Sequence, residues 1–392
     1  MRLRVFWAYI IGAIDGESAA TGGGKDVSMR GDAPALFQPA RSTSDRKMAM
    51  PNNMSVCHIV SFYVIACNQE RFIREAVSGA LAQTWTPLEV VLSDDCSDDN
   101  TFGIMQKMAE DYSGPHRIVL NRNEKRFGVG AHINRIVELC SGEWIVASAG
   151  DDVSVPERTA RLYEEWQRDG GRAGLVYSNL IEIREDGSDW YAHDFRKAVH
   201  GAPARWDYRL KLLRLSPPVH GAAFAYPRRT FDDFGPLWDG VVFEDNVLNW
   251  RAELTGGVLL CEDYLVRHRN HPGQITNRYS REALIDADNR RRLLKWSDVV
   301  SRRQNLADAK SALERGQISA EDYSAAIGRL DEELYNEASD YELFWGSLGK
   351  RWSFLLHNLH LARRLGRPSD ALFALLPRPF YIFLLKAAAL WK

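Results

Sequence analysis

The chain has 392 residues, enough for one large or two medium domains, and 45% of them are hydrophobic, as expected for a globular core. Its formal net charge of −2, from 50 basic and 52 acidic residues, excludes nucleic-acid binding that depends on an overall basic charge. Five scattered cysteines without a CxxC spacing favour a reduced cytoplasmic protein over a disulfide framework.

The first 54 residues differ in composition from the rest of the chain. They open with two arginines and a short apolar run, as a signal peptide does. The remainder is rich in Gly, Ser, Asp and Asn without periodicity, which is typical of disorder. Met48, Met50 and Met54 lie just before the first predicted strand. We expect residues 1–54 to be disordered or to result from a misassigned start.

From residue 55 to about residue 280, strand and helix patterns alternate. Short apolar runs rich in β-branched and aromatic residues predict strands. These runs are 58–66, 88–92, 117–120, 143–149, 174–179, 222–226 and 258–266. Apolar residues at helical spacing lie between them, and Asp186-Gly187 indicates a hairpin turn. This alternation is typical of an α/β fold with a mostly parallel sheet flanked by helices.

Residues 281–392 have a helical pattern with few β-rich runs, so we predict a helical C-terminal region after an α/β domain at 55–280. The final segment, 348–392, contains eight Lys or Arg against one Asp, interleaved with apolar residues. Two prolines and two basic residues interrupt its apolar run, which is therefore too short to span a bilayer. We expect a cationic amphipathic helix on an anionic membrane surface, with a core-packed helix as the alternative.

Polar clusters lie at or after several predicted strands. Asn68-Gln69-Glu70 follows the first strand, Asp94-Asp95 the second and Asp151-Asp152 the fourth, while Glu244-Asp245 precedes a helix. In open α/β sheets, ligands bind at the carboxyl ends of the strands. Asp151 and Asp152, with Gly150 allowing close approach, can hold a hard divalent cation and, through it, a diphosphate. Each cluster taken alone also fits a helix cap or a turn.

In this order, the clusters resemble those of the family 2 glycosyltransferases, which have the GT-A fold, over about residues 56–276. The resemblance rests on these segments: Asn68-Gln69-Glu70, Ser93 to Asp99 (like DDGSxD), Gly128 and Asn134, Gly150-Asp151-Asp152 (like DXD), Glu244-Asp245, and Arg269 to Gly273. It implies a Rossmann-like GT-A domain that uses a nucleoside-diphosphate sugar. Because such donors are found in the cytoplasm, the resemblance argues against export.

The resemblance implies which residues bind the donor nucleotide. Asp94 and Asp95 would bind the base and the ribose, with Asn68, Glu70 and Asn134 in the same nucleotide site. A UDP-sugar is the expected donor.

The resemblance also implies a metal-binding set and a catalytic set. Asp151-Asp152 would hold Mg²⁺ or Mn²⁺ on the diphosphate, with His271 as a further ligand and Arg269 facing the diphosphate. Asp245 would be the general base that takes the proton of the acceptor hydroxyl, with Glu244 as its neighbour. Attack from the face opposite the leaving group would invert the anomeric configuration.

Two positions depart from the family pattern. Ala149 stands where a third acidic residue is common, so fewer protein oxygens would hold the metal. Cys96 replaces the glycine of DDGSxD, which predicts a loop that is less free to adopt a positive φ.

Together these inferences predict an inverting, metal-dependent glycosyltransferase of cell-surface polysaccharide synthesis. It would extend a glycan or a lipid-linked acceptor from the cytoplasm, at the inner face of the membrane. A nucleotidyltransferase is one alternative, although such enzymes usually carry a Gly-rich basic loop after the first strand and Asn68-Gln69-Glu70 has no such glycines. A non-catalytic scaffold that binds sugar nucleotides is the other.

Overall fold

The computed structural model describes residues 59–198, 205–206, 220–274, 287–345 and 347–358, which belong to the unit Cys57–Leu375. The expectations for residues 1–54, and for the basic segment from residue 359 onward, fall outside the described residues. Within the described part, no helix combines the length and the apolar character that crossing a bilayer requires.

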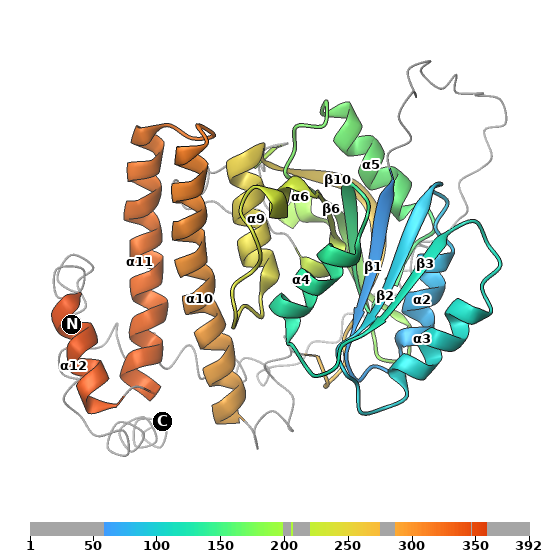
Figure 1. Cartoon of the computed structure of the whole chain (residues 1–392), viewed down its shortest axis with the longest axis horizontal. Helices are drawn as coiled ribbons and strands as arrows, with labels where there is room; N and C mark the ends of the chain where they lie inside the picture. Colours follow the sequence, from blue (N-terminus) through green and yellow to red (C-terminus); the bar gives the residue numbers. More distant parts are fainter. Residues whose placement is uncertain (1–58, 199–204, 207–219, 275–286, 346, 359–392) are drawn as a thin grey trace, which may run out of the picture. The chain divides into compact units, whose positions relative to one another are not determined.

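The first half of the sheet consists of parallel strands. Their spatial order is β3 (Arg117–Arg122), β2 (Leu88–Asp94), β1 (Val60–Ala66) and β4 (Trp144–Ala149). The helices α2 (Ile73–Leu81), α3 (Thr101–Glu110) and α4 (Val129–Leu139) connect them. The predicted alternation of strand and helix is confirmed here, and Figure 1 shows α2 and α3 on one face of these strands and α4 on the other.

The second half of the sheet mixes strand directions. It contains β9 (Phe224–Pro227), β6 (Leu175–Ile183), β10 (Val258–Arg269) and β5 (Val153–Ser154), with β7 (Asp189–His193) beside β6 and β8 (Arg205–Trp206) beside β10. β9 runs antiparallel to both β4 and β6, whereas β6 and β10 are parallel. The α/β class is confirmed, and the sheet is parallel in its first half and mixed in its second.

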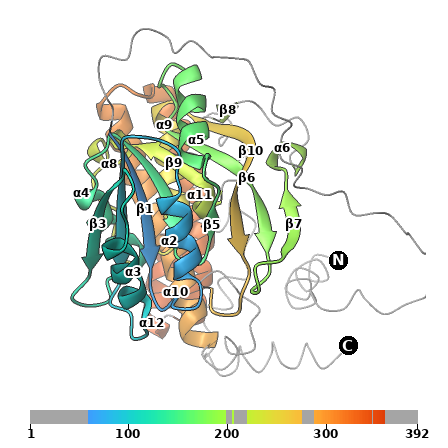
Figure 2. The same cartoon turned by 90° about the vertical axis from the view of Figure 1, so that its right-hand side faces the viewer.

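Short helices and turns complete this half. They are α5 (Arg158–Arg168), α6 (Phe195–Ala198), the 3-10 turn η1 (Gly221–Ala223), α8 (Arg229–Asp232) and α9 (Glu244–Thr255). The predicted hairpin at Asp186-Gly187 joins β6 to β7: Gly187 has φ 84°, and the Arg184 amide donates to the Ser188 carbonyl over 2.8 Å. Figure 2 shows this hairpin on the opposite side of β10 from α2.

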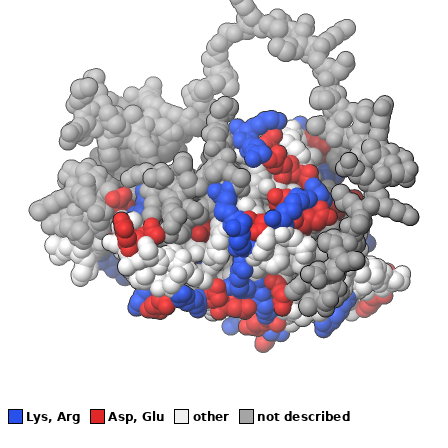
Figure 3. Space-filling view, turned by 90° about the horizontal axis from the view of Figure 1, so that it is seen from above, with Lys and Arg blue, Asp and Glu red and all other residues white. Residues whose placement is uncertain are grey.

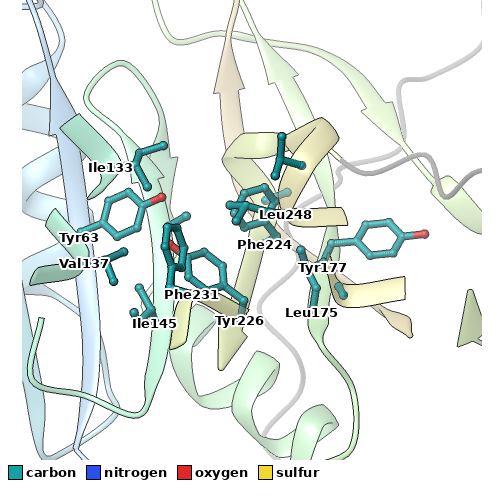
Figure 4. Packing of buried hydrophobic residues seen from close by; sticks show 14 of the residues in the cluster. Tyr63, Ile133, Val137, Ile145, Leu175, Tyr177, Phe224, Tyr226, Phe231 and Leu248 are labelled. Carbon is teal, nitrogen blue, oxygen red and sulfur yellow. The ribbon is translucent and has the colours of Figure 1, made fainter. Parts of the chain in front are cut away.

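Alternation along the strands produces two separate cores, because successive side chains of a strand point to opposite faces. Tyr63 of β1 packs with Ile133 of α4 in one cluster, which Figure 4 shows together with Tyr226 and Phe231. Phe62, the preceding residue of β1, belongs to the cluster that α2, α3 and α5 cover. Burying each such large apolar side chain contributes roughly 1.5–3 kcal/mol.

Three helices follow the sheet region: α10 (Ala287–Glu314), α11 (Ala320–Trp345) and α12 (Leu348–His357). α10 packs against α9, where the indole of Trp250 donates to the Asn305 carbonyl over 2.8 Å. Arg251 and Asp308 form a fully buried ion pair at 2.8 Å between the same two helices. The helical character of this region is confirmed, while a domain boundary near residue 280 remains a prediction.

Acidic and basic side chains are interspersed among the described residues on the face drawn in Figure 3. This mixture agrees with the near-neutral net charge of the whole chain.

Candidate active site

The carboxyl ends of the parallel strands finish at one edge of the sheet. Register places Ala66 beside Asp94, and Asp94 beside Arg122. Backbone hydrogen bonds continue across this edge: the Asp95 amide donates to Ala66 over 2.8 Å, and the Gly150 amide donates to Ile65 over 2.9 Å. The loops that carry the first three predicted clusters therefore lie next to one another.

Asn68 and Glu70 fasten the loop after β1 to the loop after β2. The Asn68 carbonyl oxygen Oδ1 accepts from the Asp98 amide over 2.8 Å, and the Glu70 carboxylate accepts from the Asn100 amide over 2.9 Å. Asn68 has φ 55°, a left-handed conformation that asparagine tolerates better than most residues. Both side chains therefore join these two loops, and their contact with a nucleotide remains a prediction.

Asp94 and Asp95 are buried, and their carboxylates accept hydrogen bonds from residues of the neighbouring loops. Asp94 is fully buried and accepts from both the amide and the hydroxyl of Ser97, with the guanidinium of Arg122 3.5 Å away. The carboxylate of Asp95 accepts from the amides of Phe127 (2.8 Å) and Gly128 (2.9 Å). These contacts fix the path from β3 to α4.

The structure differs from the expectation for Cys96. This residue adopts φ 55°, so the loop takes the left-handed conformation without a glycine. A side chain in that conformation costs roughly 1 kcal/mol, and the dense hydrogen bonding of Asp94 and Ser97 around it holds the loop in place.

Asp151, Asp152, Arg269 and His271 are brought together. The imidazole Nδ1 of His271 accepts from the Gly273 amide over 3.2 Å, so Nε2 donates to Asp151 Oδ2 over 3.0 Å. Asp152 Oδ1 accepts from the Arg269 amide over 2.9 Å. The predicted metal and diphosphate residues therefore form one cluster where the β4 and β10 ends meet.

Arg269 occupies an interior position in this cluster, with only 1% of its surface exposed. Its guanidinium donates to the carbonyls of Asp151 (3.0 Å) and Glu185 (2.9 Å) and to the carboxylate of Glu75 (2.9 Å). It also stacks on Phe72 at 5.0 Å. Arg269 therefore braces the loop that presents Asp151, and its predicted contact with the diphosphate would be additional to these bonds.

Gly150 is required by close packing. A Cβ at this position would lie 2.5 Å from the side-chain oxygen of Gln69 and 2.9 Å from Ala66. Any larger residue would push the two following aspartates out of position, which supplies a physical reason for the Gly-Asp-Asp order.

Glu244 and Asp245 begin helix α9, where carboxylates interact favourably with the helix dipole. Both are partly buried, and Asp245 Oδ1 accepts from the Asn246 amide over 2.8 Å. Burial raises the pKa of Asp245, and burial together with the charge of Asp245 raises the pKa of Glu244. A carboxylate with a raised pKa is a stronger base than an ordinary surface aspartate.

A short segment connects this pair to the Asp151-Asp152 cluster. Gly221 lies against Glu244, because a Cβ built there would be 2.8 Å from Glu244 Oε1. The preceding residue, His220, packs edge-on against His268 with ring centroids 4.2 Å apart. His268 in turn interacts electrostatically with Asp152. The two acidic pairs therefore flank the same segment.

The histidines next to the cluster titrate differently. Burial alone would lower the pKa of His268, but the carboxylates of Asp152, Glu182 and Asp151 raise it. Burial lowers the pKa of His220 to about 3, so this ring is neutral. A protonated His268 supplies positive charge beside the aspartates, although burial still raises the pKa of Asp152.

Asn134 forms its side-chain hydrogen bonds with Leu237 and not with the Asp151-Asp152 cluster. Its side-chain amide donates to the Leu237 carbonyl over 2.8 Å and accepts from the Leu237 amide over 2.8 Å. Asn134 therefore anchors the segment before Trp238, which is 44% exposed. Its predicted role in nucleotide binding remains a prediction.

His220, His268, Glu182 and Glu75 were not predicted from the sequence. The clearest available signal was Arg267-His268-Arg269, three consecutive basic residues directly after the apolar pair Leu265-Val266. Glu182 alternates with apolar residues in β6 and gave no such signal, yet it accepts from His268 Nδ1 at 3.1 Å and so fixes that ring.

The donor set suits a hard cation but is incomplete. Among the residues that the structure describes, no three His, Cys, Asp or Glu side chains converge into a ready-made metal site. Among the described residues, Asp151 uses its carboxylate oxygen Oδ2 in the bond with His271, and Asp152 uses Oδ1 in the bond with the Arg269 amide. Carboxylate oxygens are the ligands that Mg²⁺ and Mn²⁺ prefer, and water or a ligand would supply the rest.

An α/β sheet with acidic loops along its carboxyl edge defines a class of nucleotide-dependent enzymes. Residues 61–234 match the family model described as Glycosyl transferase family 2. Over residues 61–234 the chain is therefore similar to the glycosyl transferase family 2 domain. The matched segment includes Asp94, Asp95, Asp151 and Asp152 and ends before Glu244.

Two curated relatives each align with about a third of the chain. Chondroitin synthase of Escherichia coli is 35% identical over 130 residues, which are 33% of this chain and 18% of that protein. Succinoglycan biosynthesis protein ExoO of Rhizobium meliloti (strain 1021) is 33% identical over 128 residues, 33% of this chain and 35% of that protein. The matched segments thus span about a third or less of these relatives.

A solved structure of S. aureus TarS 1-349, in complex with UDP-GlcNAc, superposes with a TM-score of 0.47 at 16% identity. It covers 79% of this chain and 88% of that chain.

Proposed function

We propose that the protein is an inverting glycosyltransferase that transfers a sugar from a nucleoside-diphosphate sugar, with UDP as the expected nucleotide. The acceptor is a hydroxyl of a glycan or of a lipid-linked sugar in cell-surface polysaccharide synthesis. One observation carries this proposal: a partly buried carboxyl pair with raised pKa values, Glu244-Asp245, flanks the same segment as Asp151-Asp152.

Asp245 is the proposed general base. An acceptor hydroxyl is a weak nucleophile until a carboxylate takes its proton during attack. The raised pKa of Asp245 suits this role, and the bond from the Asn246 amide orients its carboxylate. Since the base and the leaving group lie on opposite sides of the sugar, one displacement inverts the anomeric carbon without a covalent enzyme intermediate.

Asp151 and Asp152 are the proposed ligands of a Mg²⁺ or Mn²⁺ ion, with His271 beside them. Such an ion, when bound, neutralises charge on the departing nucleoside diphosphate. His271 donates to Asp151 and thereby fixes the direction of that carboxylate. The protonated His268 adds positive charge on the same side, which favours a diphosphate.

The loops at the ends of β1 and β2 are the proposed nucleotide site. Asp94 and Asp95 hold these loops in position, and Asn68 and Glu70 join the two. Asn134 and Arg269 support the surrounding segments. We further propose that the protein works in the cytoplasm, peripherally at the inner face of the membrane, through the basic C-terminal segment.

The decisive experiment measures nucleoside diphosphate release from a panel of sugar nucleotides with Mn²⁺ present, after a thermal-shift screen for binding. Asp245→Asn should lower turnover about 100- to 10,000-fold while sugar-nucleotide binding persists. Asp232→Asn, an exposed aspartate of α8, is the matched control.

Three other outcomes contradict the proposal. Release of pyrophosphate would indicate a nucleotidyltransferase. Binding of UDP without turnover of any donor would indicate a scaffold. Unchanged turnover of Asp245→Asn would remove Asp245 from the reaction.

A further inference from the structure

A cavity of about 370 Å³ lies among helices α10, α11 and α12. Arg303 of α10, Tyr341 of α11, and Lys350, Ser353, Phe354 and His357 of α12 are among its lining residues. None of them belongs to the candidate active site. This volume is at the lower end of the range for small-molecule sites, and the pocket is open to solvent, because Arg303, Lys350, Ser353 and His357 are exposed.

Two cationic side chains, Arg303 and Lys350, and the imidazole of His357 line this cavity. Arg303, Lys350 and His357 form no ion pair with any described residue, and the described lining contains no acidic side chain. The neighbouring Arg302, by contrast, pairs with Glu333 at 3.2 Å. Like charges that share a cavity repel one another, and a bound anion removes that repulsion.

The other lining groups suit an anion that carries a small organic part. The Ser353 hydroxyl can donate to a phosphate oxygen. Phe354, which stacks on Tyr335 at 5.5 Å, and Tyr341, which contacts Trp296 at 5.3 Å, form a firmly packed aromatic wall. Lysine and arginine bind phosphate as a point charge and as a planar fork respectively, so Lys350 and Arg303 offer both modes.

We propose that this cavity binds a phosphate ester, either the headgroup of an anionic lipid or a soluble phosphate compound. The site is distinct from the proposed sugar-transfer site, and its existence does not depend on that activity. If the ligand is a lipid, the cavity would give the protein a specific contact with the membrane surface within its described helices.

The test uses the full chain and two probes: phosphatidylcholine vesicles with and without phosphatidylglycerol, and soluble glycerol phosphate. The variant Arg303→Gln/Lys350→Gln removes two cavity charges. The control Lys107→Gln/Lys310→Gln removes two exposed charges elsewhere, each from a weak i,i+4 pair. A second variant, Arg303→Lys, changes the same side chain but keeps its positive charge. It should bind as wild type does if the lost charge, and not a folding defect, weakens binding.

If the ligand is a lipid, wild type, the control and Arg303→Lys bind phosphatidylglycerol vesicles, while the double cavity variant binds on the order of tenfold or more weakly. If the ligand is soluble, glycerol phosphate raises the melting temperature of all except the cavity variant, without a vesicle preference. Equal behaviour of the cavity variant and the control in both assays overturns the proposal. Neither readout uses sugar transfer, so failure here and failure of the proposed function are separate results.

Discussion

The ring of His220 packs edge-on against the ring of His268, with centroids 4.2 Å apart. This contact joins the segment that touches Glu244 to the strand that carries Arg269. The proposed base and the proposed metal cluster therefore depend on the same two-residue segment, His220-Gly221, for their relative position.

Gly221→Ala tests this dependence. Its Cβ would lie 2.8 Å from Glu244 Oε1, so the Glu244 carboxylate beside Asp245 must shift. We expect turnover to fall about 10- to 100-fold, because displacement of a catalytic group by about 1 Å has effects of this size. Gly328→Ala in α11, where a Cβ meets nothing within 4 Å, is the control and should keep full turnover. Unchanged turnover of Gly221→Ala would contradict the proposed link.

The pH dependence of turnover should reflect the buried carboxyl pair. Burial raises the pKa of Asp245 above its ordinary value of about 4, so the base form disappears at a higher pH than in a surface aspartate. We expect kcat/KM to fall with decreasing pH through this raised pKa and to be constant above it until another group titrates. A profile that stays flat down to pH ~4 would contradict the assignment.

Glu244→Gln should stabilise the fold while reducing activity. The pKa of Glu244 is raised in the folded state, so the folded protein binds this proton more tightly than the unfolded chain and loses stability as pH rises. Removing the charge is expected to increase the free energy of unfolding at pH 7 by on the order of 1 kcal/mol or more. The gain should vanish below the ordinary glutamate pKa of about 4, which urea unfolding at two pH values would test.

The sequence predicted the parallel half of the sheet well because β1, β2 and β4 are continuous, almost wholly buried runs, and amphipathic helices lie between the four strands. It could not predict the position of β9, since four residues contain no signal for the two distant strands with which they pair. The acidic clusters were predictable because several of them follow predicted strands in one order along the chain. The partners that orient them, such as Glu182 and His268, are brought together only by the fold.

Cys96 provides an independent test of backbone strain. Because Cys96 has φ 55°, Cys96→Gly should increase the free energy of unfolding by roughly 0.5–1 kcal/mol. Cys67→Gly is the matched control, as Cys67 is exposed in the adjacent loop and does not have a positive φ. At Cys67, substitution by glycine should lower the free energy of unfolding by a few tenths to about 1 kcal/mol. Equal effects at both positions would contradict the argument.

The buried ion pair between α9 and α10 should be costly to break. Asp308→Asn would leave Arg251 charged and unpaired in the interior, with an expected loss of about 3–5 kcal/mol. Glu314→Gln, which breaks the exposed pair with Lys310, should cost less than about 0.5 kcal/mol. Urea unfolding of both variants provides the comparison, and similar losses would show that the 251–308 contact is not buried as described.

β9 also constrains the order of assembly during synthesis. Three of its residues pair with β4 and two pair with β6, so in the described sheet this strand is the seam that joins the two halves. The β4 and β6 strands precede it in the chain, and neither bonds to the other directly. A nascent chain on the ribosome therefore cannot unite the halves until Pro227 has emerged, and β10, which follows in the chain, can add to β6 only after its own later synthesis.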